Sequence, residues 1–281
     1  MNNEKPYLVA CICRKEEQYI EEFVKYHLNL GFDKVIIGDN NDIDQNNYEE
    51  ILKEYIQEGS VEIVNLRGQL CQQLPFYNRI INNYSYRWCA FIDCDEFITF
   101  SDSVPREKQN IKEFLIYVEN SHVTYNAVRL NWMCYGSNGL IYNDKRPVLE
   151  RFTTPNRFDF KFQYPFPENF HTKIILHEGT KYKNFCENPH TISGMEYIQP
   201  TNFIQVDDGP FNVNMDLDTL YIRHFYTKSF QEWVEKKMEK RTADMGESAQ
   251  QKTIENYIIY NPNDAEKVKE VLNNGSIKLI Y

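Results

Sequence analysis

The sequence predicts an α/β protein with a mostly parallel sheet, helices on both faces, and a single domain over residues 1–281. Short apolar runs of strand length alternate with amphipathic stretches through the first hundred residues, which is typical of strands joined by right-handed crossovers. Polar residues follow directly after several of these runs. Hydrophobic residues make up 42% of the chain, which is enough to form a core.

The first part of the chain contains three strand–helix units and a fourth strand. Apolar residues recur at helical spacing from Ile20 to Leu28 and from Tyr48 to Ile56, and Gly31 and Gly59 are placed to end these helices. A third helix is expected over residues 72–83. The expected strands cover residues 7–13, 34–37, 61–64 and 88–92.

The second part is less regular between about residues 134 and 210. Before it, residues 111–118 predict a helix and 127–132 a strand; after it, strand 220–224 precedes a capping box, Ser229 to Glu232, that opens a helix. A final helix from Asn263 and a short strand over 277–281 are expected to complete the chain. Within the irregular part, alternation predicts a strand with one aromatic face; its members are Phe158, Phe160, Phe162, Tyr164 and Phe166.

Two carboxylates follow the apolar run 88–92, because the chain continues Asp93-Cys94-Asp95-Glu96. An isolated carboxylate is costly inside a protein, so the acids are expected where the strand reaches the rim of the sheet. Side-chain alternation would place Asp93 and Asp95 on the same side. Such a pair suits a hard divalent cation, Mn²⁺ or Mg²⁺, which commonly bridges to substrate phosphates.

Polar residues also follow the first two strands: Arg14 and Glu16 after the first, and Asp39 after the second. In open parallel sheets, ligands bind beyond the carboxyl ends of the strands. These residues and the acids at 93–96 are therefore expected to gather at one edge of the sheet and form the binding site.

The net charge of −10 argues against nucleic acid or an anionic bilayer as the main partner, because phosphate binding depends on Lys and Arg. The seven cysteines form no C-x-x-C pair, which indicates free thiols in a reducing compartment. Cys11 and Cys13 have no evident partners for a metal site. We see neither a signal peptide nor a transmembrane segment, so we expect a cytoplasmic protein.

Five motifs occur in order along the chain: CICRKEE at 11–17, YHLNLGFD with IGDN at 26–40, FIDCDEF at 91–97, WMCYGS at 132–137 and HFYTKS at 224–229. They resemble those of glycosyltransferase family 92, its bacterial family 2-like relatives, and GT-A-fold glycosyltransferases in general. The likeness runs from about Leu8 to Arg241. Tyr135 replaces a Phe in the fourth motif, and Phe225-Tyr226 replaces a plain Tyr in the fifth.

The resemblance implies a GT-A-like, Rossmann-like fold and metal-dependent sugar transfer from a nucleotide-diphosphate donor, most naturally UDP-linked, with inversion. The acceptor would be a glycan or a lipid-linked glycan, and the enzyme would work in the cytoplasm or at the inner face of the membrane. Residues 1–100 would bind the nucleotide sugar. Residues 101–281 would form the irregular acceptor side and carry the C-terminal helices.

In this picture the metal ligands are Asp93, Asp95 and His224, with His190 as a competitor of His224. Lys173 and Arg146 are further candidates for phosphate binding. The residues expected to contact the donor are Cys11, Arg14, Glu16, Asp39, Asp93 and Lys228. Each also has an ordinary structural interpretation, such as a solvated turn acid, a packed histidine or a helix N-terminus favoured by the helix dipole.

The general base, a carboxylate that takes the proton of the acceptor hydroxyl, is not singled out by the sequence. Glu96, Glu187 and Asp208 are the main candidates, and Glu178 and Asp207 also qualify. Trp132 either stacks on the acceptor sugar or packs in the core. Two alternative functions remain at this point: a D-x-D phosphotransferase or phosphatase with Asp93 as nucleophile, and a non-catalytic glycan-binding protein.

Overall fold

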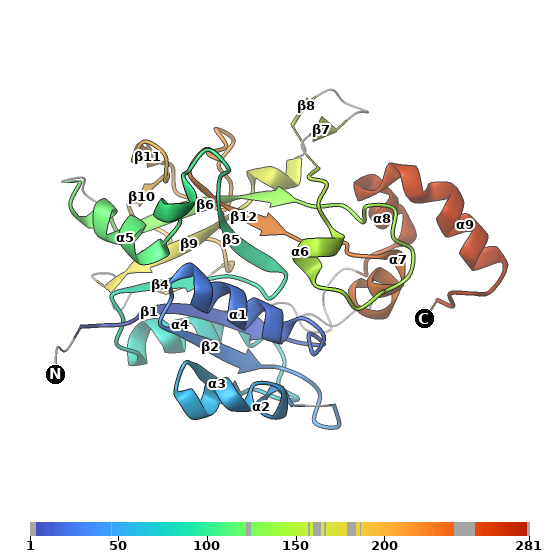
Figure 1. The fold of residues 1–281 in the computed structure, drawn as a ribbon, viewed down its shortest axis with the longest axis horizontal. Helices are drawn as coiled ribbons and strands as arrows, with labels where there is room; N and C mark the ends of the chain where they lie inside the picture. Colours follow the sequence, from blue (N-terminus) through green and yellow to red (C-terminus); the bar gives the residue numbers. More distant parts are fainter. Residues whose placement is uncertain are drawn as a thin grey trace.

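The computed structural model describes residues 4–45, 47–121, 125–156, 158–159, 164–165, 167–178, 184–185, 187–238 and 251–279. Within them a ten-stranded sheet forms the centre of the molecule (Figure 1). The order of the main row of strands is β11-β10-β6-β9-β4-β1-β2-β3. Outside this row, β12 pairs with both β6 and β5.

The sheet strands are β1 Tyr7–Cys13, β2 Lys34–Asp39, β3 Val61–Asn65, β4 Trp88–Phe91, β5 Glu96–Phe100, β6 Ala127–Cys134, β9 Thr172–His177, β10 Tyr197–Ile198, β11 Gln205–Val206 and β12 Leu220–His224. A separate hairpin is formed by β7 Phe158–Asp159 and β8 Tyr164–Pro165. The α-helices are α1 Ile20–Leu30, α2 Tyr48–Ile51, α3 Lys53–Glu58, α4 Gln73–Asn83, α5 Ile111–Glu119, α6 Val148–Arg151, α7 Phe230–Glu232, α8 Ile254–Tyr260 and α9 Ala265–Asn273. A π-helix, Trp233–Lys237, continues α7, and 3₁₀ turns cover Arg106–Lys108, Pro167–Phe170 and Pro262–Asp264.

The predicted α/β architecture is confirmed. Strand β1 pairs in parallel with β2 and β4, and β2 pairs in parallel with β3, as strand–helix units require. Strand β9 is the exception at the centre of the sheet, because it lies antiparallel between β4 and β6. This segment lies in the part of the chain where the sequence pattern is irregular and predicts no strand.

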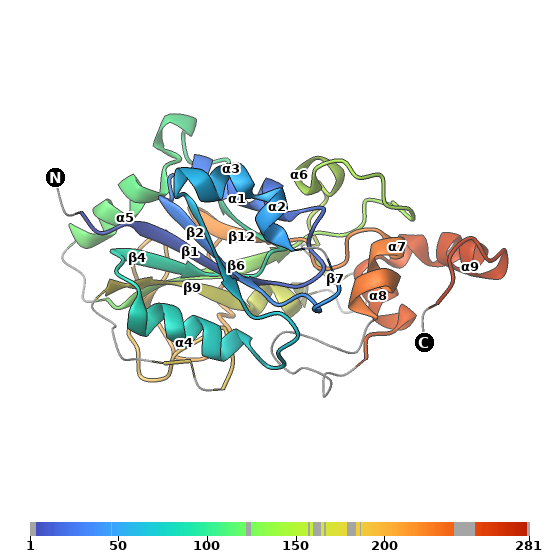
Figure 2. The same cartoon turned by 90° about the horizontal axis from the view of Figure 1, so that it is seen from below.

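Two apolar layers cover the sheet, one on each face. Side chains alternate along β1, so Val9, Cys11 and Cys13 enter one layer while Leu8, Ala10 and Ile12 enter the other. Helices α1, α2 and α5 pack on the first face and α4 packs on the second, as Figure 2 shows. Helices α7, α8 and α9 form a third apolar cluster, which lies beside the carboxyl ends of the strands (Figure 1).

The predicted glycine stops are confirmed. Gly31 ends α1 with φ 116° and Gly59 ends α3 with φ 80°, a backbone region that side chains with a Cβ rarely adopt. Space is also limited at Gly31, because a Cβ there would lie 3.0 Å from the side chain of Asn110, which caps α5.

Several boundaries differ from expectation. The strand expected to end at 92 ends at Phe91, and the helix expected over 48–56 is divided at Leu52. The strand expected over 277–281 is wrong for 277–279, which are irregular, while 280–281 lie outside the described residues. The side chains of the aromatic row at 158–166 also lie outside the described part. None of the helices described has the length and apolar character needed to cross a membrane.

Candidate active site at the carboxyl edge of the sheet

The carboxyl ends of four parallel strands meet at one edge, as the sequence predicted. Cys13 at the end of β1 lies beside Asp39 at the end of β2, and Asp39 lies beside Asn65 at the end of β3. Strand β4 ends three residues earlier in this register, with Phe91 beside Ala10. The residues that follow, 93–96, turn the chain into β5, and we call this segment the acidic turn.

Asp93 is held by three groups from two elements, α4 and β9. Its Oδ1 accepts a hydrogen bond from Gln73 Nε2 of α4 at 2.7 Å, with Tyr77 Oη at 3.4 Å. Its Oδ2 lies 2.8 Å from Nζ of Lys173, a fully buried side chain of β9. Burial opposes the charge on Lys173, yet Asp93 and Glu96 raise its pKa above the usual value. Asp93 therefore has a fixed cationic neighbour.

Asp95 points to different partners. Its Oδ2 lies 2.8 Å from Lys237 Nζ, and its Oδ1 lies 3.6 Å from His224 Nε2 at the end of β12. Burial opposes ionisation of Asp95, but Lys237 and His224 outweigh it and hold the pKa of the carboxyl well below its usual value. The structure thus brings Asp95 and His224 together, while it directs Asp93 toward Lys173.

His224, rather than His190, faces the acidic turn. Its ring packs 4.1 Å from the ring of Trp132, which is buried in the core between His224 and His171. His190 also contacts Trp132, but its Nδ1 donates to the carbonyl oxygen of Thr172 at 2.7 Å. Trp132 therefore packs on histidines, which is the structural alternative of the sequence analysis.

Glu96, the last residue of the acidic turn, is fully buried. Its Oε2 accepts the backbone N–H of Asp93 at 2.9 Å and lies 3.7 Å from Lys173 Nζ, while its Oε1 has no hydrogen-bond partner among the described residues. Burial raises the pKa of Glu96 well above its usual value, against the opposing effect of Lys173. With no exposed surface, Glu96 is placed to position the turn and not to meet an acceptor.

Asp39 and Arg14 form the next part of the edge. Asp39 is buried, its Oδ2 lies 3.1 Å from Arg67 Nη1, and its Oδ1 accepts the N–H of Asn41 at 3.1 Å. Arg14 Nη2 lies 2.7 Å from Asp42 Oδ2. These ion pairs order the loop after β2 beside the loop after β1.

Lysines gather on the other side of the acidic turn. Glu16 is paired with Lys228, at 3.3 Å, and with Lys236, and these two lysines and Lys237 border a cavity of about 500 Å³, which we call the lysine pocket. Burial lowers the pKa of Lys228 to about 8, although Asp95 opposes the shift. The Lys228 ammonium also lies 4.1 Å from the centre of the Tyr19 ring.

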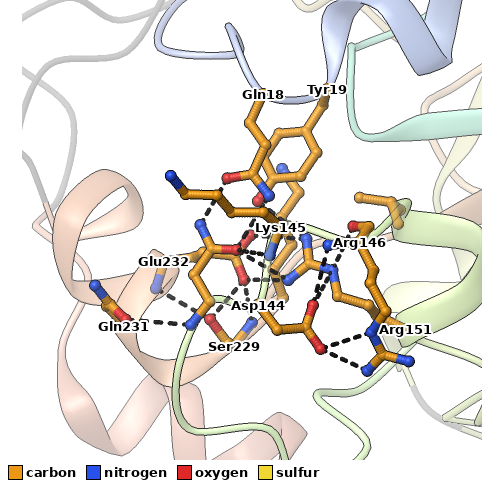
Figure 3. A network of polar contacts seen from close by, with 12 residues as sticks. Gln18, Tyr19, Asp144, Lys145, Arg146, Arg151, Ser229, Gln231 and Glu232 are labelled. Carbon is orange, nitrogen blue, oxygen red and sulfur yellow. Dashed lines mark hydrogen bonds and ion pairs between the residues drawn. The ribbon is translucent and has the colours of Figure 1, made fainter.

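A buried polar network supports the wall of this pocket (Figure 3). Arg151 of α6 lies 2.9 Å from Glu232 and donates to the hydroxyl of Tyr19 at 3.1 Å. Ser229 and Glu232 form the predicted capping box at the start of α7. The network ties α6 and the loop before α1 to the helix that leads into Lys236 and Lys237.

The remaining base candidates occupy varied positions. Glu178 pairs with Lys5 and Arg87 at the amino end of β4, the opposite edge of the sheet from the acidic turn. Asp208 accepts hydrogen bonds from Thr191 Oγ1 and the Gly194 N–H, and Asp207 and Glu187 are exposed.

Some site residues were absent from the sequence prediction. The sequence pattern does not point to Gln73 or Lys237, and it gives no partner for Lys173. The apolar run Ile174–Leu176 after Lys173 was a usable signal for a buried strand. Cys11, predicted to contact the donor, is fully buried beside Cys13, with 3.3 Å between the two sulfur atoms.

Comparisons with solved structures find distant likenesses. TarS from S. aureus is 13% identical with a TM-score of 0.44, over 81% of this chain and 62% of that chain. The mannosyltransferase PcManGT from Pyrobaculum calidifontis, solved with GDP-Man and Mn²⁺, is 12% identical with a TM-score of 0.41, over 74% of this chain and 58% of that chain. This chain therefore spans less than two thirds of either. No curated protein matched it.

The family assignment rests on a different comparison. The model of glycosyltransferase family 92 matches residues 7–259, which include the acidic turn, His224 and the lysine pocket. That range covers most of the chain, and it confirms the resemblance seen in the five motifs. The chain belongs to glycosyltransferase family 92.

Proposed function

We propose that this protein is a metal-dependent glycosyltransferase that moves a sugar from a nucleotide-diphosphate donor to a glycan or lipid-linked glycan, with inversion. One observation carries the proposal: the carboxyl edge of the sheet gathers Asp39, Asp95 and His224 next to a lysine-lined cavity of about 500 Å³. Family membership favours sugar transfer over the phosphotransferase and glycan-binding alternatives.

The residues at the acidic turn fit a divalent cation. Asp95 Oδ1 and His224 Nε2 lie 3.6 Å apart and face each other, so one ion could take both as ligands. An imidazole ligand suits Mn²⁺, whereas Mg²⁺ prefers oxygen, and either ion normally completes its shell with water and substrate phosphates. Both oxygens of Asp93 have protein partners, so we assign Asp93 to orientation of the site. When bound, the cation would neutralise the diphosphate leaving group.

Positively charged side chains of the protein would add to this neutralisation of the diphosphate. Lys228 borders the lysine pocket and, while protonated, adds positive charge where a leaving diphosphate would gain negative charge. Arg14 and Glu16 lie at the loop after β1, where they would contact the base or phosphates of the donor. Asp39 at the end of β2 is placed to accept hydrogen bonds from uracil or ribose, a UDP-type donor. TarS from S. aureus has been solved with UDP-GlcNAc, a donor of the same class.

For the general base we propose Glu187. It is exposed and follows Phe185, whose ring lies 5.5 Å from that of Tyr77, a neighbour of Asp93. It also precedes His190, which contacts Trp132. The described residues on either side of Glu187 therefore contact Tyr77, a neighbour of Asp93, and Trp132, a neighbour of His224. Asp208, in contrast, is occupied by Thr191 and Gly194.

The acceptor side is assigned to residues 101–281, with residues 1–100 as the donor side. Six described cysteines are free, consistent with the proposed cytoplasmic location. Contact with the inner face of a membrane would be peripheral and would bring a lipid-linked acceptor to the site.

A thermal-shift panel of nucleoside diphosphates and nucleotide sugars, with and without Mn²⁺, tests the donor class. Stabilisation by ligand follows mass action, so one nucleotide series is expected to raise Tm only when Mn²⁺ is present. Asp95→Asn should abolish this shift, and the exposed turn variant Asp102→Asn should keep it. If no nucleotide shifts Tm, the proposal is wrong.

The base is tested separately, with Glu187→Gln and the matched control Asp208→Asn. General base catalysis contributes about 10²- to 10⁴-fold, so Glu187→Gln should lower kcat for sugar transfer by at least about a hundredfold. Its nucleotide-dependent Tm shift should remain. Equal activity of Glu187→Gln and wild type would exclude Glu187 while leaving the donor site intact.

A further inference from the structure

Three buried cysteines meet beneath the acidic turn. Cys11 and Cys13 point to the same face of β1, and Cys94 comes from the turn itself, between Asp93 and Asp95. The sulfur atoms of Cys11 and Cys13 are 3.3 Å apart, and all three lie within 4.8 Å of one another. Of the described residues, these form the group of potential metal ligands that the fold gathers.

The composition of this group selects a particular kind of ion. All three donors are sulfur atoms, which favour soft cations such as Cu(I), while Mn²⁺ and Mg²⁺ favour oxygen. Structural Zn²⁺ sites are almost always four-coordinate, and no histidine or carboxylate belongs to this group. Three sulfur ligands without a fourth partner therefore fit Cu(I) better than Zn²⁺.

The surroundings of the three sulfur atoms are closed. Cys11, Cys13 and Cys94 expose 0%, 1% and 3% of their surfaces, so a bound ion would be shielded from water. Burial raises the pKa of all three thiols well above its usual value, so they are neutral until a metal displaces their protons. Three thiolates and one Cu(I) leave a net charge of −2, and Lys236 near Cys13 and Lys228 near Cys94 partly offset the cost of burying it.

We propose that Cys11, Cys13 and Cys94 form a trigonal thiolate site for one Cu(I) ion. Binding forms three Cu–S bonds and releases the three thiol protons to solvent, with no change of oxidation state. The ion would link β1 to the acidic turn, two segments that lie far apart in the sequence. This site is separate from the oxygen and nitrogen ligands at Asp95 and His224, and the proposal does not depend on the donor or acceptor.

The test is an anaerobic titration of the full chain with Cu(I) in competition with the chelator bicinchoninate. One Cu(I) per chain is expected. Single replacements Cys11→Ser, Cys13→Ser and Cys94→Ser should each weaken binding by more than the roughly tenfold to hundredfold that loss of an outer-shell partner costs. The controls Cys71→Ser, at an exposed position, and Cys89→Ser, at a buried one, should bind as the wild type does.

X-ray absorption on the copper-loaded wild type gives a readout that does not depend on variants that may misfold. Three sulfur neighbours around copper are expected. Two sulfur neighbours, a nitrogen-rich shell, no binding above the competitor, or loss of binding in Cys71→Ser would each overturn the proposal. If the nucleotide-dependent Tm shifts are unchanged in the absence of copper, the proposed donor site does not require the copper site. The copper proposal can then fail without the donor-site proposal failing.

Discussion

Asp95 illustrates how one carboxylate at the site is shared between competing partners. Its two oxygens face Lys237 and His224, and its pKa is held low, so the acid is ionised over the ordinary pH range. A cation bound by Asp95 and His224 has to compete with the ammonium of Lys237 for the same negative charge. In the proposed metal site, Lys237 would therefore limit how tightly the free enzyme binds a metal.

Replacing Lys237 with Met should strengthen Mn²⁺ binding in the absence of nucleotide. Removal of one competing ion pair of about 1 kcal/mol corresponds to a roughly fivefold lower Kd, measurable by isothermal titration calorimetry. Lys53→Met, at an exposed position on α3, is the matched control and should leave Kd unchanged. Weaker Mn²⁺ binding in Lys237→Met would contradict the competition.

Lys228 should give the enzyme an alkaline limit. Burial lowers the pKa of Lys228 to about 8, so its ammonium is present below that pH and is lost above it. The kcat/KM for the donor is expected to fall as pH rises through about 8. Lys228→Arg, whose guanidinium stays charged, should remove this fall. A wild-type profile that is flat through this range would refute the role.

The same pKa shift acts on stability in the opposite direction. The folded protein releases the Lys228 proton at about pH 8, whereas an unfolded lysine holds it to about 10.5. The unfolded state therefore binds more protons in that window, and the contribution of Lys228 to the free energy of unfolding rises with pH. Urea denaturation of wild type and Lys228→Met across this window should show the difference.

The place of Asp93 and Asp95 at the carboxyl edge of the sheet was predictable, because unpaired carboxylates are costly inside a protein and are expected at the end of a buried run. Asp95 is nevertheless buried, because Lys237 and His224 pair with it. The separate partners of the two acids were not predictable. Lys237 reaches Asp95 from 142 positions away in the chain, through a helix whose local register is π rather than α. No spacing rule along the sequence reports such a contact.

At the scale of elements, the helix that begins at Ser229 determines where the site lysines lie. The capping box fixes the start of α7, and the π-helix Trp233–Lys237 follows without interruption. A π-helix shifts the side-chain register relative to an α-helix, and such segments are frequent at functional sites. Here that register presents Lys236 to Glu16 and Lys237 to Asp95.

Ser229→Ala and Thr253→Ala form a matched pair, because each residue starts a helix with a capping box. Each variant should lose about 1 kcal/mol of stability, measured by chemical denaturation. Only Ser229→Ala should also raise KM for the donor. Thr253 caps α8, and none of the described residues that line the lysine pocket belongs to α8. An equal effect of both variants on KM would show that the cap has no specific role in the site.

The elements of residues 1–92 were predictable because they have a clear period and in several cases a clear stop, such as Gly31. Strands β5 and β9 were harder. Glu96–Phe100 follows the acidic turn without a turn-forming glycine or proline, and Thr172–His177 lies in a region rich in Pro and Asn. Both are recognisable as strands only through their partners, since β5 pairs with β12 and β9 with β4 and β6.

At the scale of the whole molecule, the sheet joins the two proposed halves. Strand β9 from the second half lies against β4 from the first, and β12 pairs with β5. Removal of the second half would leave β4 and β5 without these partners, with their hydrogen-bonding groups and apolar side chains exposed. The proposed donor half, residues 1–100, therefore depends on the proposed acceptor half for its fold.

A fragment of residues 1–100 should not fold alone. Circular dichroism in increasing urea should show no cooperative transition, in contrast to the full chain. Nucleotide should not stabilise the fragment either. A sigmoidal transition with a nucleotide-dependent midpoint would show instead that the donor side is an autonomous domain.

The antiparallel insertion of β9 also has a consequence for biosynthesis. A ribosome delivers β4 early, but the neighbour that completes its pairing emerges only when residues 172–177 have been made. Until then the nascent chain exposes the unpaired backbone edge of β4 and its apolar side chains. Such an edge can pair with other chains. Pairing over such long sequence separations is also slow. Yield in the cell should therefore depend on chaperones that shield this edge during translation.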